Sequence, residues 1–298
     1  MSSLLQLPDS LSEQLSKGKN LRANGYIGRF APSSSGPLHL GNLRTALISW
    51  LRARLLNGIW MLRVDDLDVG RNREGAVESF MHDLNWLGLH WDGPVVLQSQ
   101  RRGLYFSFLS SLRVQGRLYA CRCTRSILSQ QRQKDASQKI YPGTCRNLGL
   151  EWGDKDGRLP SWRLRVREKF SNLCGDVLLR RSDGYISYHL ATVIDELTLG
   201  ISEVVRGVDL ASSTTPQSAV IDALEQEPPS YKHVPLMLDS RGRKLAKREG
   251  NDGLHALMAK GFRAPQVIGL LASSLNLVPK GVDLSAKDLL DDLKNVSH

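Results

Sequence analysis

The stretch 29–42 places an arginine, a rigid turn, an imidazole and a glycine next to a predicted helix start. Residues 26–30 have strand character, the Pro- and Ser-rich stretch 32–37 excludes regular structure, and 38–56 has apolar residues at helical spacing. A strand, a tight loop and a helix start in this order aim backbone N–H groups at one crevice. The pattern therefore predicts an anion site that suits a triphosphate.

Two side chains of this stretch are candidates for direct contact with a nucleotide. His39 can donate to phosphate oxygens, and Gly41 lets the backbone or an adenine ring approach closely. A His-x-Gly pair is a weak signal by itself, and an ordinary capped helix with a surface histidine is the competing interpretation.

A second basic motif lies far downstream, at 239–248. It contains a glycine and five cations between Arg241 and Arg248, and it follows an apolar run, 234–238, that is typical of a strand. Runs of charge are usually solvated faces or tails. Because this one follows a predicted strand, we expect a loop held at the end of a sheet.

The two motifs together resemble the two signatures of class I aminoacyl-tRNA synthetases, with 39–42 standing for the first and 244–248 for the second. Further segments between them resemble the glutamate branch and occur in family order: 63–68, 83–92, 188–191, 194–196 and 200–210. The resemblance covers most of the chain. It implies a Rossmann-like, doubly wound parallel sheet with a zinc-bearing insertion and a short helical C-terminal part.

The resemblance also implies the roles of individual residues. The implied catalytic residues are His39 and Lys247, and the implied ATP site adds Gly41, Asn42 and Lys244. The implied glutamate site consists of Arg29, Phe30, Ala31, Pro32, Ser33, Asp65, Tyr188 and Arg206. In it, Arg29 would pair the side-chain carboxylate, Asp65 would take the α-amino group, Tyr188 would contact the amino acid, and Arg206 would supply a second cation.

Three positions depart from the family pattern. Asp65 stands where glutamate is usual, so the amino-group contact is one methylene shorter. Ala246 and Arg248 stand where the lysine loop usually has small hydroxyl residues. A slower or weaker ATP site is the expected consequence, with Arg248 restoring charge.

The implied reaction is attack of the glutamate carboxylate on the α-phosphate of Mg²⁺-bound ATP, which gives glutamyl-adenylate and pyrophosphate. The chain ends at His298, before any large helical anticodon-binding region. It is therefore most similar to the short paralogues of glutamyl-tRNA synthetase, and this similarity implies transfer of glutamate to the queuosine base of tRNA(Asp), with activation independent of tRNA. Three alternatives stay open: a truncated synthetase charging a 3′ end, a small-molecule nucleotidyltransferase, and a non-catalytic RNA-binding paralogue.

Cysteine spacing is the third informative feature. Cys121 and Cys123 are followed by Cys145, and three thiolates on turn-forming segments supply most of a tetrahedral zinc site. The competing interpretation is three reduced cysteines in a small core. The resemblance implies Tyr141 as the fourth ligand of one structural zinc ion. Cys174 stands apart, and we expect it to be a packing residue.

Composition agrees with an RNA partner. The 298 residues carry 40 Lys and Arg against 30 Asp and Glu, a net charge of +10, which suits a polyanion. The sequence contains no long apolar run and no secretion signal at its start. We expect a cytoplasmic monomer without membrane contact.

Helical spacing is also predicted over 75–87, 104–114, 216–225, 264–274 and 285–293. We expect five segments along the chain. They are a loosely ordered extension (1–24), the first half of the catalytic domain (25–117), the zinc-bearing insertion (118–180), the second half of the catalytic domain with the lysine loop (181–250), and a helical C-terminal part (251–298).

Overall fold

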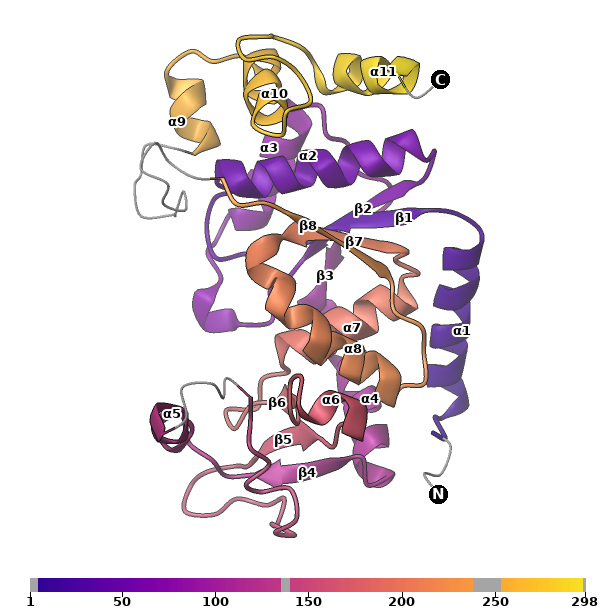
Figure 1. Ribbon diagram of the computed structural model, residues 1–298, viewed down its shortest axis with the longest axis vertical. Helices are drawn as coiled ribbons and strands as arrows, with labels where there is room; N and C mark the ends of the chain where they lie inside the picture. Colours follow the sequence, from indigo (N-terminus) through magenta and orange to yellow (C-terminus); the bar gives the residue numbers. More distant parts are fainter. Residues whose placement is uncertain (1–4, 135–139, 238–252, 297–298) are drawn as a thin grey trace. The chain divides into compact units, whose positions relative to one another are not determined.

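The computed structural model describes residues 5–134, 140–237 and 253–296 (Figure 1). The chain divides into two compact units. The first unit comprises residues 1–21, 100–200 and 212–229, and the second unit comprises 22–99, 201–211 and 230–298.

The second unit contains the parallel strands. Its elements are β1 (Ile27–Phe30), α2 (Leu40–Leu55), β2 (Ile59–Val64), the 3₁₀ turn η1 (Val69–Arg71), α3 (Ala76–Trp86), β3 (Val96–Leu97), β7 (Glu203–Gly207), β8 (Ser230–Val234), α9 (Leu254–Ala259), α10 (Ala264–Ser273) and α11 (Ala286–Val296). Strands β1, β2 and β3 pair in parallel in that order, and β7 pairs in parallel with β8. Strand β7 lies beside β1, where the N–H of Ser202 donates to Ile27 O at 2.9 Å. The expected parallel α/β architecture is confirmed.

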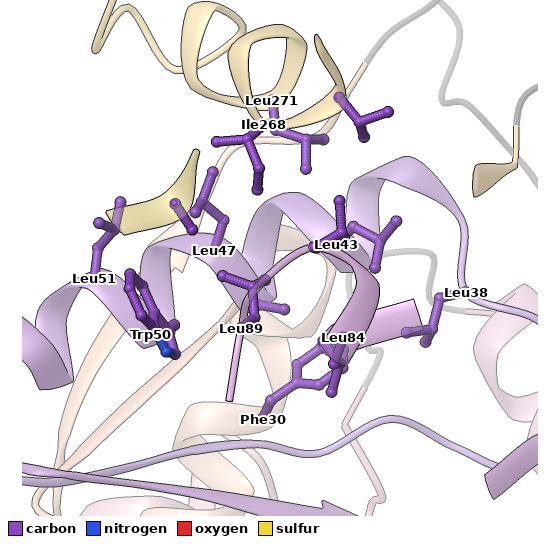
Figure 2. Packing of buried hydrophobic residues seen from close by; sticks show 14 of the residues in the cluster. Phe30, Leu38, Leu43, Leu47, Trp50, Leu51, Leu84, Leu89, Ile268 and Leu271 are labelled. Carbon is purple, nitrogen blue, oxygen red and sulfur yellow. The ribbon is translucent and has the colours of Figure 1, made fainter. Parts of the chain in front are cut away.

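Helix α2 is the centre of this unit. It packs on β1 and β2 and also contacts α10 and α11 (Figure 1). Leu43, Leu47, Trp50 and Leu51 of α2 belong to one buried cluster with Phe30, Leu84, Leu89, Ile268 and Leu271 (Figure 2). A helix buried on several sides needs apolar residues around most of its circumference. The predicted helix over 38–56 satisfies that need, and Ser49 in its middle donates a hydrogen bond to Arg29 O of β1 at 3.0 Å.

The first unit contains an antiparallel sheet and several helices. Its elements are α1 (Asp9–Ala23), which extends two residues past the unit boundary, α4 (Arg102–Val114), β4 (Leu118–Cys121), α5 (Arg125–Lys134), β5 (Ser161–Leu164), α6 (Glu168–Ser171), β6 (Leu178–Arg180), α7 (Tyr188–Thr198) and α8 (Thr214–Ala223). The 3₁₀ turns η2 (Gln98–Arg101) and η3 (Val208–Ser213) lie at the boundaries between the units. Strand β5 pairs with both β4 and β6. This small sheet occupies the stretch that was expected to be an insertion.

Two sequence-based expectations need correction. The start of the chain was expected to be loosely ordered, but Asp9–Ala23 form helix α1, with Leu11, Leu15 and Gly18 buried. These three positions have helical spacing, which the surrounding polar residues obscured. The strand expected over 234–238 is instead Ser230–Val234, because the ladder with β7 ends at Val234, and Pro235, which follows, has no N–H to continue it. Leu238 lies outside the described residues.

None of the helices in the described part of the chain combines the length and the apolar character that crossing a bilayer requires.

Candidate functional site

His39 is the N-cap of α2. Its Nδ1 accepts from the N–H of Asn42 at 3.2 Å, and Asn42 Oδ1 accepts from the N–H of His39 at 3.3 Å. Each side chain thus satisfies a backbone donor of the other residue, as in a capping box. The capped helix of the competing interpretation is therefore present, and the cap residue is the half-buried histidine itself, while the nucleotide role of His39 stays a prediction.

This cap also fixes the tautomer of a neutral His39 ring. Because Nδ1 accepts a hydrogen bond, the ring proton must be on Nε2. A ring held in this way at a helix start presents an N–H donor beside the positive end of the helix dipole. This arrangement can bind an anion such as a phosphate.

Gly41 leaves room for the His39 ring. A Cβ at position 41 would lie 3.0 Å from both Cε1 and Nδ1 of His39. The sequence predicted that Gly41 allows close approach of the backbone or an adenine ring. The structure adds that the glycine accommodates the histidine of the same motif.

Arg29 and Arg206 bring two buried guanidinium groups to neighbouring strands. Arg29 of β1 is 4% exposed and donates from Nη1 to Val205 O at 3.0 Å. Arg206 of β7 is 3% exposed; its Nε lies 3.3 Å from His233 Nε2, and its Cζ lies 4.9 Å from the centre of the Tyr231 ring. Burial, followed by the charge of Arg206, lowers the pKa of His233 below its ordinary value. Strands β1 and β7 thus carry two buried guanidinium groups side by side, and the lowered pKa keeps His233 uncharged at neutral pH.

Asp65 lies beside the loop that follows β1. Its N–H donates to Pro32 O at 2.9 Å, and Asp65 and Ser33 form an isolated parallel bridge. Arg63 donates from Nε to Asp65 Oδ1 at 2.8 Å. An anionic group is thereby positioned next to the loop that continues from Arg29.

The loop 31–35 is tied down by its own polar contacts. Ser34 is buried and donates to Asn72 Oδ1 at 2.6 Å, and Asn72 donates to Asp66 O at 2.9 Å. Phe30 is buried against Trp60, with ring centres 6.4 Å apart. Because the Phe30 side chain is buried, Phe30 can contact a bound glutamate only through its backbone. Ala31 and Ser33, also predicted to bind glutamate, are accessible to solvent.

Three predicted residues lie outside the described part of the second unit. Lys244 and Lys247 lie outside the described residues, as do the departures Ala246 and Arg248. Tyr188 is the first residue of α7 in the first unit and is 37% exposed, with its ring 5.7 Å from that of His189. Their roles stay predictions.

The predicted zinc ligands form a compact cluster in the first unit. Cys123 Sγ lies 3.5 Å from Cys145 Sγ, and Tyr141 Oη lies 3.4 Å from Cys121 Sγ and 3.6 Å from Cys123 Sγ. A tetrahedral zinc site with ordinary bond lengths separates its ligand atoms by roughly 3.5–3.8 Å. The residues fit a zinc ion that would cross-link the segments carrying them. Cys174 is not part of the cluster; its Sγ donates to Phe170 O and Gly175 O.

Three contacts hold the tyrosine in place. Arg163 is 8% exposed and its Cζ lies 3.7 Å from the centre of the Tyr141 ring. Gly175 has a φ of 64°, and a Cβ there would lie 2.6 Å from Tyr141 O. The N–H of Cys145 donates to Tyr141 Oη at 3.0 Å, so this oxygen acts as an acceptor at the centre of the cluster.

The thiols respond differently to this environment. Burial by itself would raise the pKa of Cys121. Two hydrogen bonds, from Tyr141 and from the N–H of Cys123, together with the positive charge of Arg163, outweigh burial and lower this pKa below its ordinary value. Burial raises the pKa of Cys123 to about 11. Cys121 is thus the thiol whose surroundings favour the thiolate that a metal requires.

The sequence did not single out Arg63 or Arg163. Arg63 begins the segment 63–68 that resembles the glutamate branch, so its contact with Asp65 two residues later could have been found there. Arg163 lies on β5 and reaches Tyr141 through the fold, and no local signal indicates it.

Comparison with known proteins identifies relatives over nearly the whole chain. "Glutamyl-Q tRNA(Asp) synthetase" of Prochlorococcus marinus (strain MIT 9313) is 62% identical over 97% of this chain and 94% of its own length. The protein of that name from Parasynechococcus marenigrum (strain WH8102) is 55% identical, over 97% of each chain.

A solved structure shares the fold. A glutamate tRNA ligase from Elizabethkingia meningosepticum, crystallised in complex with its amino acid, superposes with a TM-score of 0.74 at 24% identity, over 89% of this chain and 64% of that one. The family "tRNA synthetases class I (E and Q), catalytic domain" matches residues 27–263. The chain therefore belongs to the class I tRNA synthetases of the glutamate and glutamine type, whose ATP-dependent ligase fold it has.

Proposed function

We propose that this chain activates L-glutamate with ATP, without needing tRNA, and transfers the glutamyl group to the queuosine base in the anticodon loop of tRNA(Asp). The observation that carries the acceptor is the 62% identity, over 97% of this chain, to a relative named glutamyl-Q tRNA(Asp) synthetase. Family membership by itself supports a ligase that uses ATP, with Mg²⁺, and a tRNA.

The charges of the second unit support glutamate as the amino acid. Glutamate has two carboxylates and one ammonium group, and the site offers Arg29, Arg206 and Asp65. A planar guanidinium binds a carboxylate through two parallel hydrogen bonds. We assign the side-chain carboxylate to Arg29 and the ammonium group to Asp65, and Arg206 supplies the second positive charge.

Activation needs little covalent help from the protein. An oxygen of the α-carboxylate of glutamate forms a bond to the α-phosphorus, and the bond from that phosphorus to the bridging oxygen breaks as pyrophosphate leaves. Catalysis of this kind depends on positioning and on stabilisation of charge. In this assignment the Nε2–H of His39 and the N-terminus of α2 hold phosphate oxygens, and Lys244 and Lys247 meet the charge that develops on pyrophosphate.

The cysteine cluster has a structural role in this proposal. Cys121, Cys123, Tyr141 and Cys145 would hold one zinc ion, which would supply a rigid cross-link and no reactive ligand. Four protein ligands complete a tetrahedron, so no position is left for substrate.

The first test separates activation from RNA binding. Exchange of labelled pyrophosphate into ATP should occur with glutamate in the absence of tRNA. Glutamine should support it far less, because its side-chain amide carries no negative charge to pair with a guanidinium, a mismatch that costs about 2–5 kcal/mol. No exchange with well-folded protein, with or without tRNA, would favour the RNA-binding alternative.

The second test locates the acceptor. Labelled glutamate is transferred to tRNA(Asp), the product is cut with nuclease, and the fragments are separated. Label should stay with the anticodon fragment, and tRNA(Asp) lacking queuosine should be inert. Label on the 3′-terminal adenosine would instead identify an atypical glutamyl-tRNA synthetase.

A further inference from the structure

A second cluster of metal-ligand side chains lies in the second unit, where α3 and α9 meet. Asp83 of α3 is 1% exposed, whereas the side chains of His82 and His255 are 62% and 55% exposed. His255 Nε2 lies 2.8 Å from Asp83 Oδ1, and His82 Nδ1 lies 3.6 Å from the same oxygen. One ligand atom from each of the three residues falls within 4.8 Å of the other two.

The Asp83 carboxylate is not fully satisfied by these contacts. Its Oδ2 is buried and has no hydrogen-bond partner among the described residues. A buried carboxylate is costly unless charge or hydrogen bonds compensate it. His255 Nε2 contacts Oδ1 and not Oδ2, so the second oxygen of the buried carboxylate is left uncompensated. A bound cation would compensate it directly.

We propose that His82, Asp83 and His255 form a binding site for a divalent metal ion of the zinc type, distinct from the cysteine cluster. Two imidazole nitrogens and one carboxylate oxygen suit zinc and similar transition metals, whereas calcium and magnesium prefer sites made of oxygen alone. Ligand atoms of a tetrahedral zinc ion lie roughly 3.3–3.5 Å apart. The two observed distances to Asp83 Oδ1, 2.8 Å and 3.6 Å, need adjustments of less than an ångström, and the two histidine nitrogens lie within 4.8 Å of each other. Both histidines are exposed and can make these movements.

The site is open on one side. His82 and His255 line a surface depression together with Gly75, Glu78, Ser79 and Met258. Three protein ligands leave at least one coordination position, which water or the Glu78 carboxylate can fill from this depression. The ion would therefore be exchangeable, in contrast to one held by four protein ligands.

The position of His255 gives the site a structural consequence. Gly253 forms an isolated antiparallel bridge with His39, and Leu254 is buried in the core of the unit. His255 follows these two residues directly and is eight positions after Lys247 in the sequence. A metal ion bound to His255 and Asp83 would fasten to α3 the segment that pairs with His39.

The test counts metal ions in the folded protein. Chelator-treated protein is dialysed against zinc, and zinc per chain is measured by mass spectrometry for wild type, for the double variant His82→Gln/His255→Gln, and for His90→Gln. His90 is an exposed histidine of the same unit outside the cluster. The double variant should bind one zinc fewer than wild type, and His90→Gln should bind the wild-type number. Because both replaced rings are exposed, circular dichroism should show an unchanged fold.

Cobalt distinguishes this site from the cysteine cluster. The spectrum of the cobalt-loaded wild type minus that of the double variant should contain visible bands without thiolate charge-transfer absorption, because no sulfur ligates here. Equal zinc content in wild type and double variant would overturn the proposal. So would an equal loss of zinc in His90→Gln, which would indicate nonspecific binding to surface histidines.

Discussion

Arg63 holds the carboxylate of Asp65 with two hydrogen bonds, from Nε to Oδ1 at 2.8 Å and from Nη2 to Oδ2 at 3.3 Å. Arg63 is 1% exposed, so this pair is fixed from the protein interior. Asp65 stands where the glutamate branch usually has glutamate. Arg63 therefore holds the shorter side chain of Asp65 in a defined orientation.

Asp65→Asn should impair activation of glutamate. The amide keeps the shape of the side chain and removes the charge proposed to bind the ammonium group. We expect kcat/KM for glutamate in pyrophosphate exchange to fall by about 30-fold or more, which corresponds to roughly 2 kcal/mol. Asp65→Glu should retain more activity than Asp65→Asn. A wild-type kcat/KM in the Asp65→Asn variant would show that Asp65 does not bind the ammonium group. A melting curve of the same variant serves as the control, because Arg63 loses its charged partner and the protein could unfold.

His39 has two functions that substitutions can separate. His39→Asn keeps an N-cap acceptor and removes the Nε2 donor, whereas His39→Ala removes both. Both variants should lose about 10²–10³ in the rate of pyrophosphate exchange. His39→Ala alone should also lose about 1 kcal/mol of unfolding free energy, measured in urea. If His39→Asn exchanged pyrophosphate at the wild-type rate, the ring would be a cap and nothing more.

Much of the fold was predictable from the sequence because its central helix forms a long segment rich in apolar residues. The predicted helix over 38–56 corresponds to α2, Leu40–Leu55, which is apolar on several faces. Helix α1 was missed because only Leu11, Leu15 and Gly18 are buried in a polar segment.

The candidate site was predictable only in part. His39, Gly41 and Asn42 are close in the sequence, and their contacts follow from a helix start. The contact of Arg29 with Val205 joins strands that are far apart in the chain. The sequence predicted the helix that carries Asp83, with a buried apolar face. The contact of Asp83 with His255 could not be predicted in the same way, because His255 belongs to α9, about 170 residues later. Local patterns cannot specify such contacts.

Gly41→Ala should separate stability from activity. Alanine favours a helix over glycine by up to about 1 kcal/mol, but its Cβ would lie 3.0 Å from the His39 ring. The ring should shift from its place, so pyrophosphate exchange should slow by about tenfold or more while the melting temperature stays within a few degrees of wild type. Unchanged exchange kinetics in this variant would show that the ring position does not matter. Gly103→Ala, on α4 with no atom within 4 Å of the added Cβ, is the matched control.

The cysteine cluster should account for one zinc ion per chain. Cys123→Ser and Cys145→Ser should each lower zinc content and melting temperature, because a structural zinc ion contributes directly to folding stability. Cys174→Ser should retain wild-type zinc, since its thiol lies outside the cluster. Full zinc occupancy in the Cys123→Ser/Cys145→Ser double variant would exclude the site. Full occupancy in Tyr141→Phe would exclude only the fourth ligand.

The pair formed by Arg52 and Glu203 should make the stability of the second unit dependent on acid pH. Glu203 on β7 is 8% exposed and accepts hydrogen bonds from Arg52 of α2, including one of 2.7 Å from Nη2, and from Tyr26 Oη at 2.8 Å. Burial would raise the pKa of Glu203, but the hydrogen bonds from Arg52 and Tyr26 lower it below its ordinary value of 4.5. A depressed pKa in the folded state stabilises the protein above the unfolded-state pKa, and this contribution is lost as the pH falls through the folded-state value.

Glu203→Gln should therefore lower the unfolding free energy at pH 7 by about 1–3 kcal/mol, and the difference from wild type should shrink as the pH approaches 3. The lower end of this range is expected because Arg52 is 34% exposed and remains partly solvated. Urea unfolding at a series of pH values measures both quantities. Glu13→Gln, on the exposed side of α1, should show no such convergence with wild type. A wild-type–variant difference that stayed constant between pH 7 and pH 3 would mean that Glu203 contributes through packing and not through its charge.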